Sequence, residues 1–305
     1  MNDEPQLQVT RKLQDSPMVR SLPRSGLVAR GRRDAVLLGS PDPVPEEDRK
    51  ALFDAVNLAF LANRRPMDDV LMDAERGDPE QQNILAWGYL FDPRRKNLVL
   101  ADKWYRLSSE QGFAPSQFSL GWMHDNAHFG VQDWVEAAKW YRCAADQSFA
   151  PAQFNLGAMY DSGEGVGQDF AEAVNWYRRA AEQGLSEAQF NLGLKYERGQ
   201  GVTRDNEEAV RWYRMAAQRN PSAQFKLGRC YRDGQGVPQD YVQAHMWINL
   251  AASGAGEDDQ KLFAEIRDMI AAKMTAVQVS EAQRLAREWK PLEGNNLALT
   301  VMSEF

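Results

Sequence analysis

The chain has 305 residues, of which 43% are hydrophobic and 26% charged, and its formal net charge is -7 at pH 7. This composition allows a substantial apolar core and is typical of an ordinary globular protein. It excludes a membrane-spanning helix, which needs roughly 20 consecutive apolar residues, and a disulfide framework, because the chain has only two cysteines, Cys143 and Cys230.

The first 45 residues are predicted to form a disordered arm, because they contain many prolines and little apolar periodicity. The arm is basic, whereas the rest of the chain is acidic and would repel nucleic acid. Its run Arg30-Gly31-Arg32-Arg33 could touch anionic lipid, but three arginines are too few for tight binding, so a solubilising arm is the preferred interpretation. Residues 1–20 lack the apolar segment of a secretory signal, which indicates a cytoplasmic location.

An internal repeat dominates the rest of the chain. The triplet Trp-Tyr-Arg recurs every 36 residues, and the pair Leu-Gly recurs in step with it. The triplets begin at Trp104, Trp140, Trp176 and Trp212, and the pairs begin at Leu120, Leu156, Leu192 and Leu227. Two markers that keep the same phase indicate a stack of equivalent structural units.

Each unit is predicted to be two antiparallel helices. In the unit from Ala150 to Gly184, apolar residues recur at helical spacing on both sides of the turn-forming segment 161–165. Asp169 is the expected N-cap of the second helix, with Glu172 completing a capping box, and Gly184 is the expected left-handed residue after it. The glycine of each Leu-Gly pair is expected where two helices approach closely.

The predicted fold is an all-α solenoid of about six stacked hairpins, because one hairpin cannot bury its own apolar faces. The repeat domain is expected over residues 46–290, with a degenerate hairpin in 46–77, repeats in 78–255 and a terminal cap in 256–290. Within these limits, helical patterns fall in residues 46–63, 66–76, 257–273 and 279–289. The tail, residues 291–305, is apolar from Leu297 to Met302, which suits packing on the cap or docking elsewhere.

The segments Ala188-Gln189-Phe190-Asn191-Leu192-Gly193 and Ala209-Val210-Arg211-Trp212-Tyr213-Arg214 resemble the Sel1-like repeat family of tetratricopeptide-like solenoids. The resemblance covers roughly residues 66–290. It implies a right-handed superhelix and a bacterial scaffold or adaptor that binds other proteins. A cysteine-rich branch of that family is linked with β-lactams, but this chain lacks the paired cysteines of that branch, so the activity is not carried over.

The tetratricopeptide pattern implies a concave groove lined by the fifth, ninth and twelfth residues of each first helix. The predicted partner-binding residues are therefore Phe118, Trp122, Asp125, Phe154, Asp161, Phe190, Leu194, Glu197, Arg229 and Arg232. The fifth position is phenylalanine in every clear unit, and for that series packing within the repeat is the preferred alternative. The other two series change from acidic to basic along the chain, which would suit a segment that carries both charge signs.

Chemistry-bearing motifs are scarce. The chain has no phosphate-binding loop and no nucleophile elbow. His124 and His128 are four residues apart, but Asn126 and Ala127 begin a turn between them, so no metal site is predicted. No cofactor and no catalysis are expected.

The sequence thus predicts a cytoplasmic adaptor that holds a protein or peptide segment in its concave groove. Two alternatives are a membrane-surface scaffold tethered by the basic arm and, with less support from the residues, a hydrolase of cell-wall material. The sequence does not identify the partner.

Overall fold

The computed structural model describes residues 67–92, 94–128 and 130–291, and every regular element in these ranges is a helix. The helices are α5 (Met67–Glu75), α6 (Pro79–Phe91), α7 (Leu98–Glu110), α8 (Ala114–Asp125), α9 (Trp134–Asp146), α10 (Ala150–Ser162), α11 (Phe170–Glu182), α12 (Ser186–Arg198), α13 (Asn206–Ala216), α14 (Pro221–Asp233), α15 (Tyr241–Gly254), α16 (Glu257–Ala271) and α17 (Ala276–Glu288). The all-α solenoid predicted from the repeat is confirmed.

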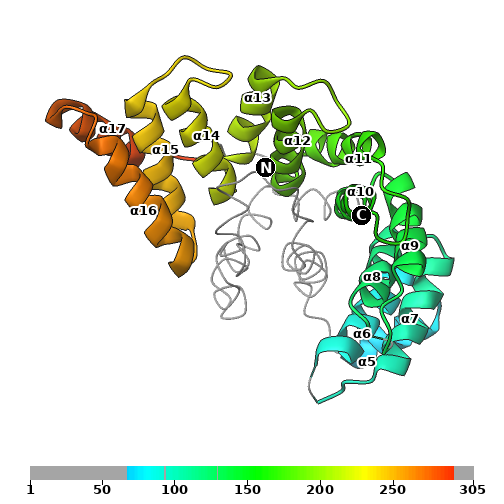
Figure 1. Ribbon diagram of the computed structural model, residues 1–305. Coiled ribbons are helices and arrows are strands. Elements are labelled where there is room, and N and C mark those ends of the chain that lie inside the picture. The colour runs from blue at the N-terminus through cyan, green and yellow to red at the C-terminus, as the bar shows by residue number, and fades with distance from the viewer. Residues whose placement is uncertain (1–66, 93, 129, 292–305) are drawn as a thin grey trace, which may run out of the picture.

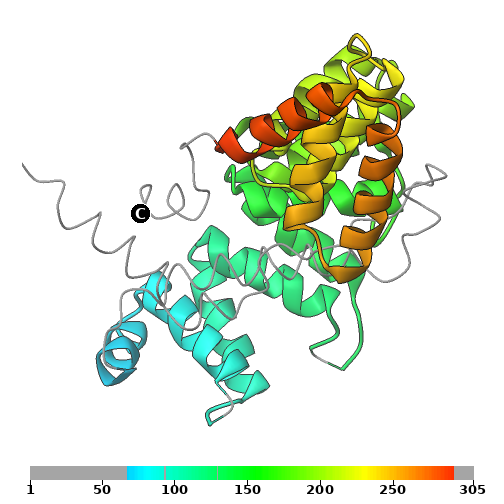
Figure 2. The same ribbon diagram turned by 90° about the vertical axis from the view of Figure 1, so that its left-hand side faces the viewer.

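The helices from α6 to α15 form five antiparallel hairpins that stack in chain order into an arc (Figure 1). The first helix of a hairpin lies toward the inside of the arc, and the second lies outside, as α8 and α9 or α10 and α11 show in Figure 1. From the side, the cyan end of the stack lies low and the orange and red helices α16 and α17 lie high, so the arc also rises along its length as a superhelix does (Figure 2). The expected arm, the helix at 46–63 and residues 292–305 of the tail lie outside the described residues.

Aspartates begin the second helices. Asp169 Oδ1 accepts hydrogen bonds from the backbone N–H groups of Ala171 (2.9 Å) and Glu172 (3.1 Å), which confirms the predicted N-cap. The reciprocal capping box forms elsewhere, between Thr275 and Gln278 at the start of α17. Gly184 has φ of 90°, as expected for the left-handed residue that follows a helix.

The glycine of each Leu-Gly pair lies against a side chain of the second helix, which is a tyrosine ring at Gly121, Gly157 and Gly193 and Ile248 at Gly228. A Cβ atom added to Gly157 would lie 2.9 Å from Tyr177 Cδ1, and one added to Gly193 would lie 2.6 Å from Tyr213 Cε1. These distances are shorter than van der Waals contact, so only glycine lets the two helices of a hairpin approach this closely. The close approach inferred from the repeat is therefore confirmed.

A second contact sets the distance between neighbouring hairpins. Gly165, in the turn after α10, lies against the first residue of α9, and a Cβ atom there would be 2.1 Å from the Trp134 carbonyl oxygen. Gly201 and Gly236 make the equivalent contacts with the carbonyl oxygens of Phe170 and Asn206. The turns thus dock on the preceding second helix at a regular interval.

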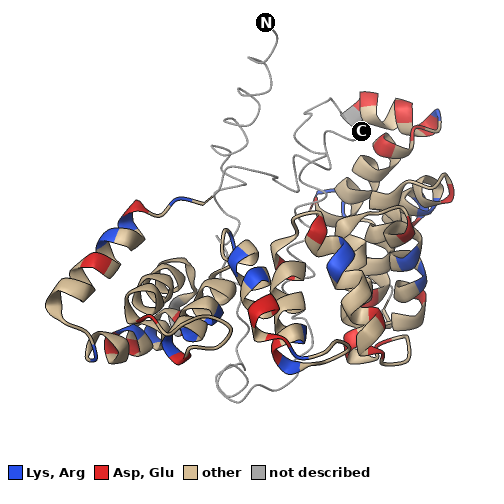
Figure 3. Ribbon diagram, turned by 90° about the horizontal axis from the view of Figure 1, so that it is seen from above, with Lys and Arg blue, Asp and Glu red and all other residues tan. Residues whose placement is uncertain are grey.

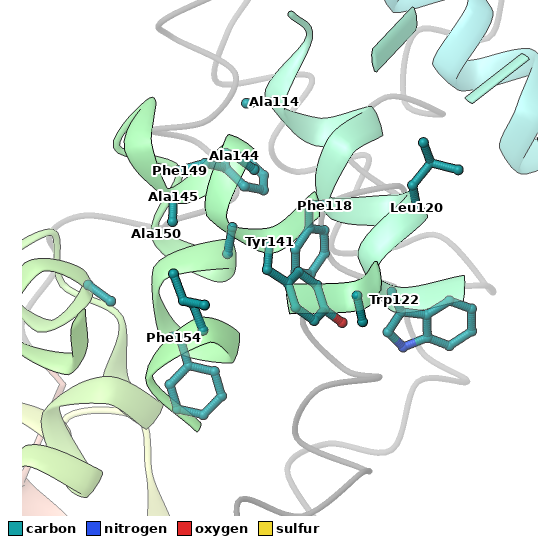
Figure 4. Packing of buried hydrophobic residues seen from close by; sticks show 14 of the residues in the cluster. Ala114, Phe118, Leu120, Trp122, Tyr141, Ala144, Ala145, Phe149, Ala150 and Phe154 are labelled. Atoms are coloured by element: carbon teal, nitrogen blue, oxygen red, sulfur yellow. The ribbon is translucent and has the colours of Figure 1, made fainter. Parts of the chain in front are cut away.

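The core continues through the stack as three clusters of buried residues, and the partly buried Tyr196 and Tyr231 each pack against two of them. The ring of Phe118 packs against those of Tyr141 (5.7 Å between centroids) and Phe149 (5.6 Å), as Figure 4 shows. Glutamine side chains also join neighbouring hairpins. Gln153 donates to the carbonyl oxygen of Ala145 in the preceding hairpin (3.2 Å) and accepts a hydrogen bond from Gln183 in its own hairpin (2.7 Å). Equivalent glutamines at 82, 117, 189 and 224 donate to the preceding helix in the same way.

The cap differs from a repeat, because α16 and α17 both pack against α15. Phe263 of α16 stacks on Phe225 with ring centroids 4.3 Å apart, and Trp289 meets Trp247 edge-on at 5.9 Å. These rings cover apolar surface that a further hairpin would otherwise bury.

Candidate functional site

The fifth position of α8, α10 and α12 packs inside its own hairpin, whereas Phe225 of α14 stacks on Phe263 of the cap. The rings of Phe154 and Tyr177 are 5.8 Å apart, and those of Phe190 and Tyr213 are 5.9 Å apart. Phe118 and Phe154 are fully buried, and Phe190 is half-buried. Phe118 and Phe154 therefore do not line an open surface, and that prediction is wrong for them. The alternative, packing within the repeat, describes their contacts, because the two helices of each hairpin lie so close that the rings are enclosed between them.

The burial of the ninth position differs between the two halves of the stack. Trp122 is 2% exposed and packs against Phe91 and His128, so it belongs to the core. Leu194 and Arg229 are half-buried. Because the open part of this series is confined to α12 and α14, the prediction for Trp122 is also corrected.

The twelfth position joins helices through its carboxylates. The hydroxyls of Tyr141, Tyr177 and Tyr213 donate to Asp125, Asp161 and Glu197 respectively, each within one hairpin. Asp161 and Glu197 also bind lysines of the next first helix, so this series is not the free acidic surface that was predicted. Arg232 donates to its neighbour Asp233 (2.7 Å).

Two lysine–carboxylate pairs bridge neighbouring first helices. Lys195 of α12 pairs with Asp161 of α10, and their side chains are 4% and 12% exposed. Lys226 of α14 pairs with Glu197 of α12 at 3.0 Å. Burial would raise the pKa of Glu197, but Lys226, the Tyr213 hydroxyl and Arg229 outweigh it and lower that pKa. Burial lowers the pKa of both lysines, although each carboxylate opposes the shift.

A series of arginine–tyrosine hydrogen bonds links the second helix of one hairpin to the first helix of the next. The sequence analysis did not predict it. Arg178 donates to the Tyr196 hydroxyl of the next hairpin (2.9 Å), Arg214 donates to Tyr231 (2.8 Å), and Arg142 makes the same bond with Tyr160. The signal was present, because a tyrosine stands four residues after Leu156, Leu192 and Leu227, in step with the arginine of the preceding Trp-Tyr-Arg triplet.

The sixth position was also missed. Residues 5 and 8 of a first helix face the second helix, and residue 10 reaches the preceding first helix, as Lys195 does. Helical periodicity leaves positions 2, 6, 9 and 13 on a third side of the helix, and at positions 6 and 9 only the residues of α12 and α14 keep access to solvent, because those of α8 and α10 are buried. The sixth residues are Ser119, Asn155, Asn191 and Lys226. All four are polar, and Ser, Asn and Lys all occur among them, which is the signal that could have found this position.

Acidic and basic residues are interspersed along the arc, as Figure 3 shows. Within the described residues, no group of three or more His, Cys, Asp or Glu side chains is placed to hold a metal ion. Burial lowers the pKa of His124 and of His128. Helix α8 ends at Asp125, so the turn expected between the two histidines is present. None of the helices described could cross a membrane.

Comparison with known proteins identifies the repeat. The family model described as Sel1 repeat matches residues 82–113, 114–149, 150–185, 186–220 and 221–255, which together make up more than half of the chain. No curated protein matches.

Two solved structures are similar over most of the chain. A protective antigen present in uropathogenic Escherichia coli strains, displaying an SLR fold, is 31% identical with a TM-score of 0.66, and the match covers 85% of this chain and 56% of that one. The chain thus spans little more than half the length of that antigen. A Sel1 repeat protein from Oxalobacter formigenes is 30% identical with a TM-score of 0.62, and the match covers 80% of this chain and 99% of that one. The chain belongs to the Sel1 repeat family.

Proposed function

We propose that the chain is a non-catalytic adaptor that binds a segment of another protein on the inner face of its arc. One observation carries the proposal: the recurring residues form the frame, whereas the half-buried residues at positions 6 and 9 differ between α12 (Asn191, Leu194) and α14 (Lys226, Arg229). A constant frame with a varying face suits the recognition of one irregular partner. The family adds support, because Sel1 repeat proteins generally mediate protein–protein interaction and are typically not catalytic.

Blocking the inner face tests the proposal. Asn191→Trp places a large ring at the half-buried sixth position of α12, where it would obstruct any bound segment whatever its charge. Tagged full-length protein is used for affinity capture from a lysate of the source organism, followed by mass spectrometry. We expect a protein that wild type retains and Asn191→Trp loses.

The matched control is Arg211→Trp, because Arg211 lies on α13, outside the arc, and its side chain is 75% exposed. The control should retain the same protein as wild type. If Asn191→Trp retains every protein that wild type does, the inner face is not the binding surface.

The cytoplasmic location and the role of the basic arm stay predictions. They depend on residues 1–45, which the structure does not describe. Co-sedimentation of the full chain and of residues 46–305 with anionic liposomes distinguishes a membrane-surface scaffold, which would lose binding with the arm, from an adaptor that does not use the membrane.

A further inference from the structure

A cavity of about 560 Å³ lies between α5, α6 and α7, at the cyan end of the arc (Figure 1). Trp104 and Leu107 of α7 give it an apolar wall, and Glu75 and Glu110 line it with exposed carboxylates. The volume is within the range of cavities that hold small ligands, so a single long side chain fits.

The cavity carries more negative than positive charge. Its charged lining residues are Glu75, Glu110 and Lys103, and within the described part of the chain none of the three forms an ion pair. Lys103 Nζ lies 5.2 Å from the centre of the Trp104 ring, which shows that a cation can approach this ring. Two carboxylates against one ammonium group favour a further cation.

The equivalent place two hairpins later holds a guanidinium of the chain itself. Arg179 stands three residues after Trp176, as Leu107 stands three residues after Trp104. The Arg179 guanidinium lies 4.5 Å from the centre of the Trp176 ring, and that of Arg142, from the preceding hairpin, lies 5.7 Å from it. An arginine is therefore the side chain that the repeat places on this tryptophan.

Acidic residues occupy equivalent positions at both tryptophans. Glu75, at the end of α5, corresponds to Asp146, at the end of α9. Glu110, at the end of α7, corresponds to Glu182, at the end of α11. The carboxylates thus recur around the two rings.

The two arginines do not recur. Leu71 of α5 takes the place of Arg142, and Leu107 of α7 takes the place of Arg179. Leu71 packs against the core, and Leu107 is 36% exposed. Neither leucine can balance the carboxylates, so the cavity beside α7 lacks the cation that its counterpart on α11 has.

We propose that the cavity receives an arginine side chain of another protein, whose guanidinium stacks on Trp104 and faces the carboxylates of Glu75 and Glu110. The methylene groups of that arginine pack on Leu107. Arginine suits the cavity better than lysine, because a planar and weakly hydrated guanidinium stacks on aromatic rings. The occupant belongs to a protein, because Sel1 repeat proteins generally mediate protein–protein interaction. This second binding site goes beyond the proposed function, which concerns the inner face.

The test is an NMR titration of the full chain with N-acetyl-arginine amide, whose only charge is on the side chain, as in a peptide. The indole N–H signal of Trp104, assigned with Trp104→Phe, reports on the cavity. We expect this signal to shift to saturation with a millimolar dissociation constant. The neutral isostere N-acetyl-citrulline amide should bind at least about tenfold more weakly.

Three variants should change the affinity in different directions. Leu107→Arg supplies the guanidinium from the chain itself, as Arg179 does on α11, and should abolish binding of the probe. The variant Glu75→Gln, Glu110→Gln should bind at least about threefold more weakly. Lys103→Gln should bind more tightly, because it removes a like charge from the cavity.

The matched control is Glu207→Gln, Glu265→Gln, which removes two exposed carboxylates from α13 and α16 and should bind as wild type. A Trp104 signal that does not shift, equal binding of the two probes, or binding that Leu107→Arg leaves unchanged would overturn the inference. So would free arginine that binds at least about tenfold more tightly than the blocked probe, because the cavity would then be a site for the amino acid. These outcomes leave the inner face untouched, since Asn191→Trp tests it separately.

Discussion

At the scale of single residues, the structure depends on glycines that lie so close to a neighbouring helix that no side chain fits there. Gly193 lies under the Tyr213 ring, which is fully buried and donates its hydroxyl proton to Glu197. The ring is held at both ends and cannot move aside without disturbing the hairpin. Glycine at this point is therefore a requirement of packing, although it lowers intrinsic helix stability by about 1 kcal/mol.

We expect Gly193→Ala to destabilise the protein by about 1–3 kcal/mol, because its new methyl group would meet the Tyr213 ring at 2.6 Å. The change is measured by urea unfolding. Gly167→Ala is the control, since a Cβ atom at Gly167 has no neighbour within 4 Å. Equal effects of the two substitutions would contradict the packing argument.

Ser148 shows the opposite case, a side chain where glycine belongs. Its φ is 64°, and it occupies the place that Gly112 and Gly184 occupy in neighbouring hairpins, with φ of 85° and 90°. Ser148→Gly should stabilise the protein by about 0.5–1 kcal/mol, because glycine adopts this conformation without steric cost. Thermal unfolding checks the direction, and Gly184→Ser should shift the midpoint the other way.

At the scale of helices, neighbouring hairpins are joined by buried ion pairs as well as by apolar contact. Asp161 and Lys195 are 34 positions apart in the chain, yet their charged atoms meet at the junction of α10 and α12. Met159 occupies the equivalent place to Lys195 one hairpin earlier and is fully buried. An apolar side chain is thus compatible with this junction.

Breaking the pair on one side should be worse than removing it. We expect Asp161→Asn to cost about 3 kcal/mol, because it leaves the Lys195 charge buried without its counterion. The double variant Asp161→Asn, Lys195→Met should recover most of that loss, as a double-mutant cycle in urea would measure. A double variant as unstable as Asp161→Asn alone would show that the loss does not come from the unpaired charge of Lys195.

At the scale of the whole molecule, a solenoid distributes its stability along the stack, since each hairpin contacts only its neighbours. The cap then acts locally: Phe263 covers Phe225, and Trp289 covers Trp247. A destabilising substitution at one end should therefore lower the local stability of the nearest hairpins and leave that of distant hairpins unchanged.

Hydrogen exchange tests this locality. Phe263→Ala should cost about 3 kcal/mol and lower the protection of α14 to α16, while α6 to α9 keep theirs. Met269→Ala, on the same helix but 69% exposed, should change little. Uniform loss of protection along the chain would mean that the stack unfolds as one cooperative unit.

The repeat in the sequence was sufficient to determine the hairpins, the capping aspartates, the left-handed glycine after α11 and the family. All of these follow from local rules: helical periodicity, turn residues and a period that returns every 36 residues. The candidate site was predicted less well. Leu194 and Arg229 are half-buried and stay predictions, but Phe118, Trp122 and Phe154 are buried and the carboxylates of Asp161 and Glu197 are paired.

Only the tertiary structure decided which polar residues meet. The pairing of Glu197 with Lys226, of Asp161 with Lys195 and of Arg178 with Tyr196 depends on how far and at what angle one hairpin is displaced from the next. That displacement results from glycine-to-ring and glycine-to-carbonyl contacts acting together across several helices. A sequence states that such contacts recur, but the position of each side chain relative to the neighbouring hairpin is a property of the assembled stack.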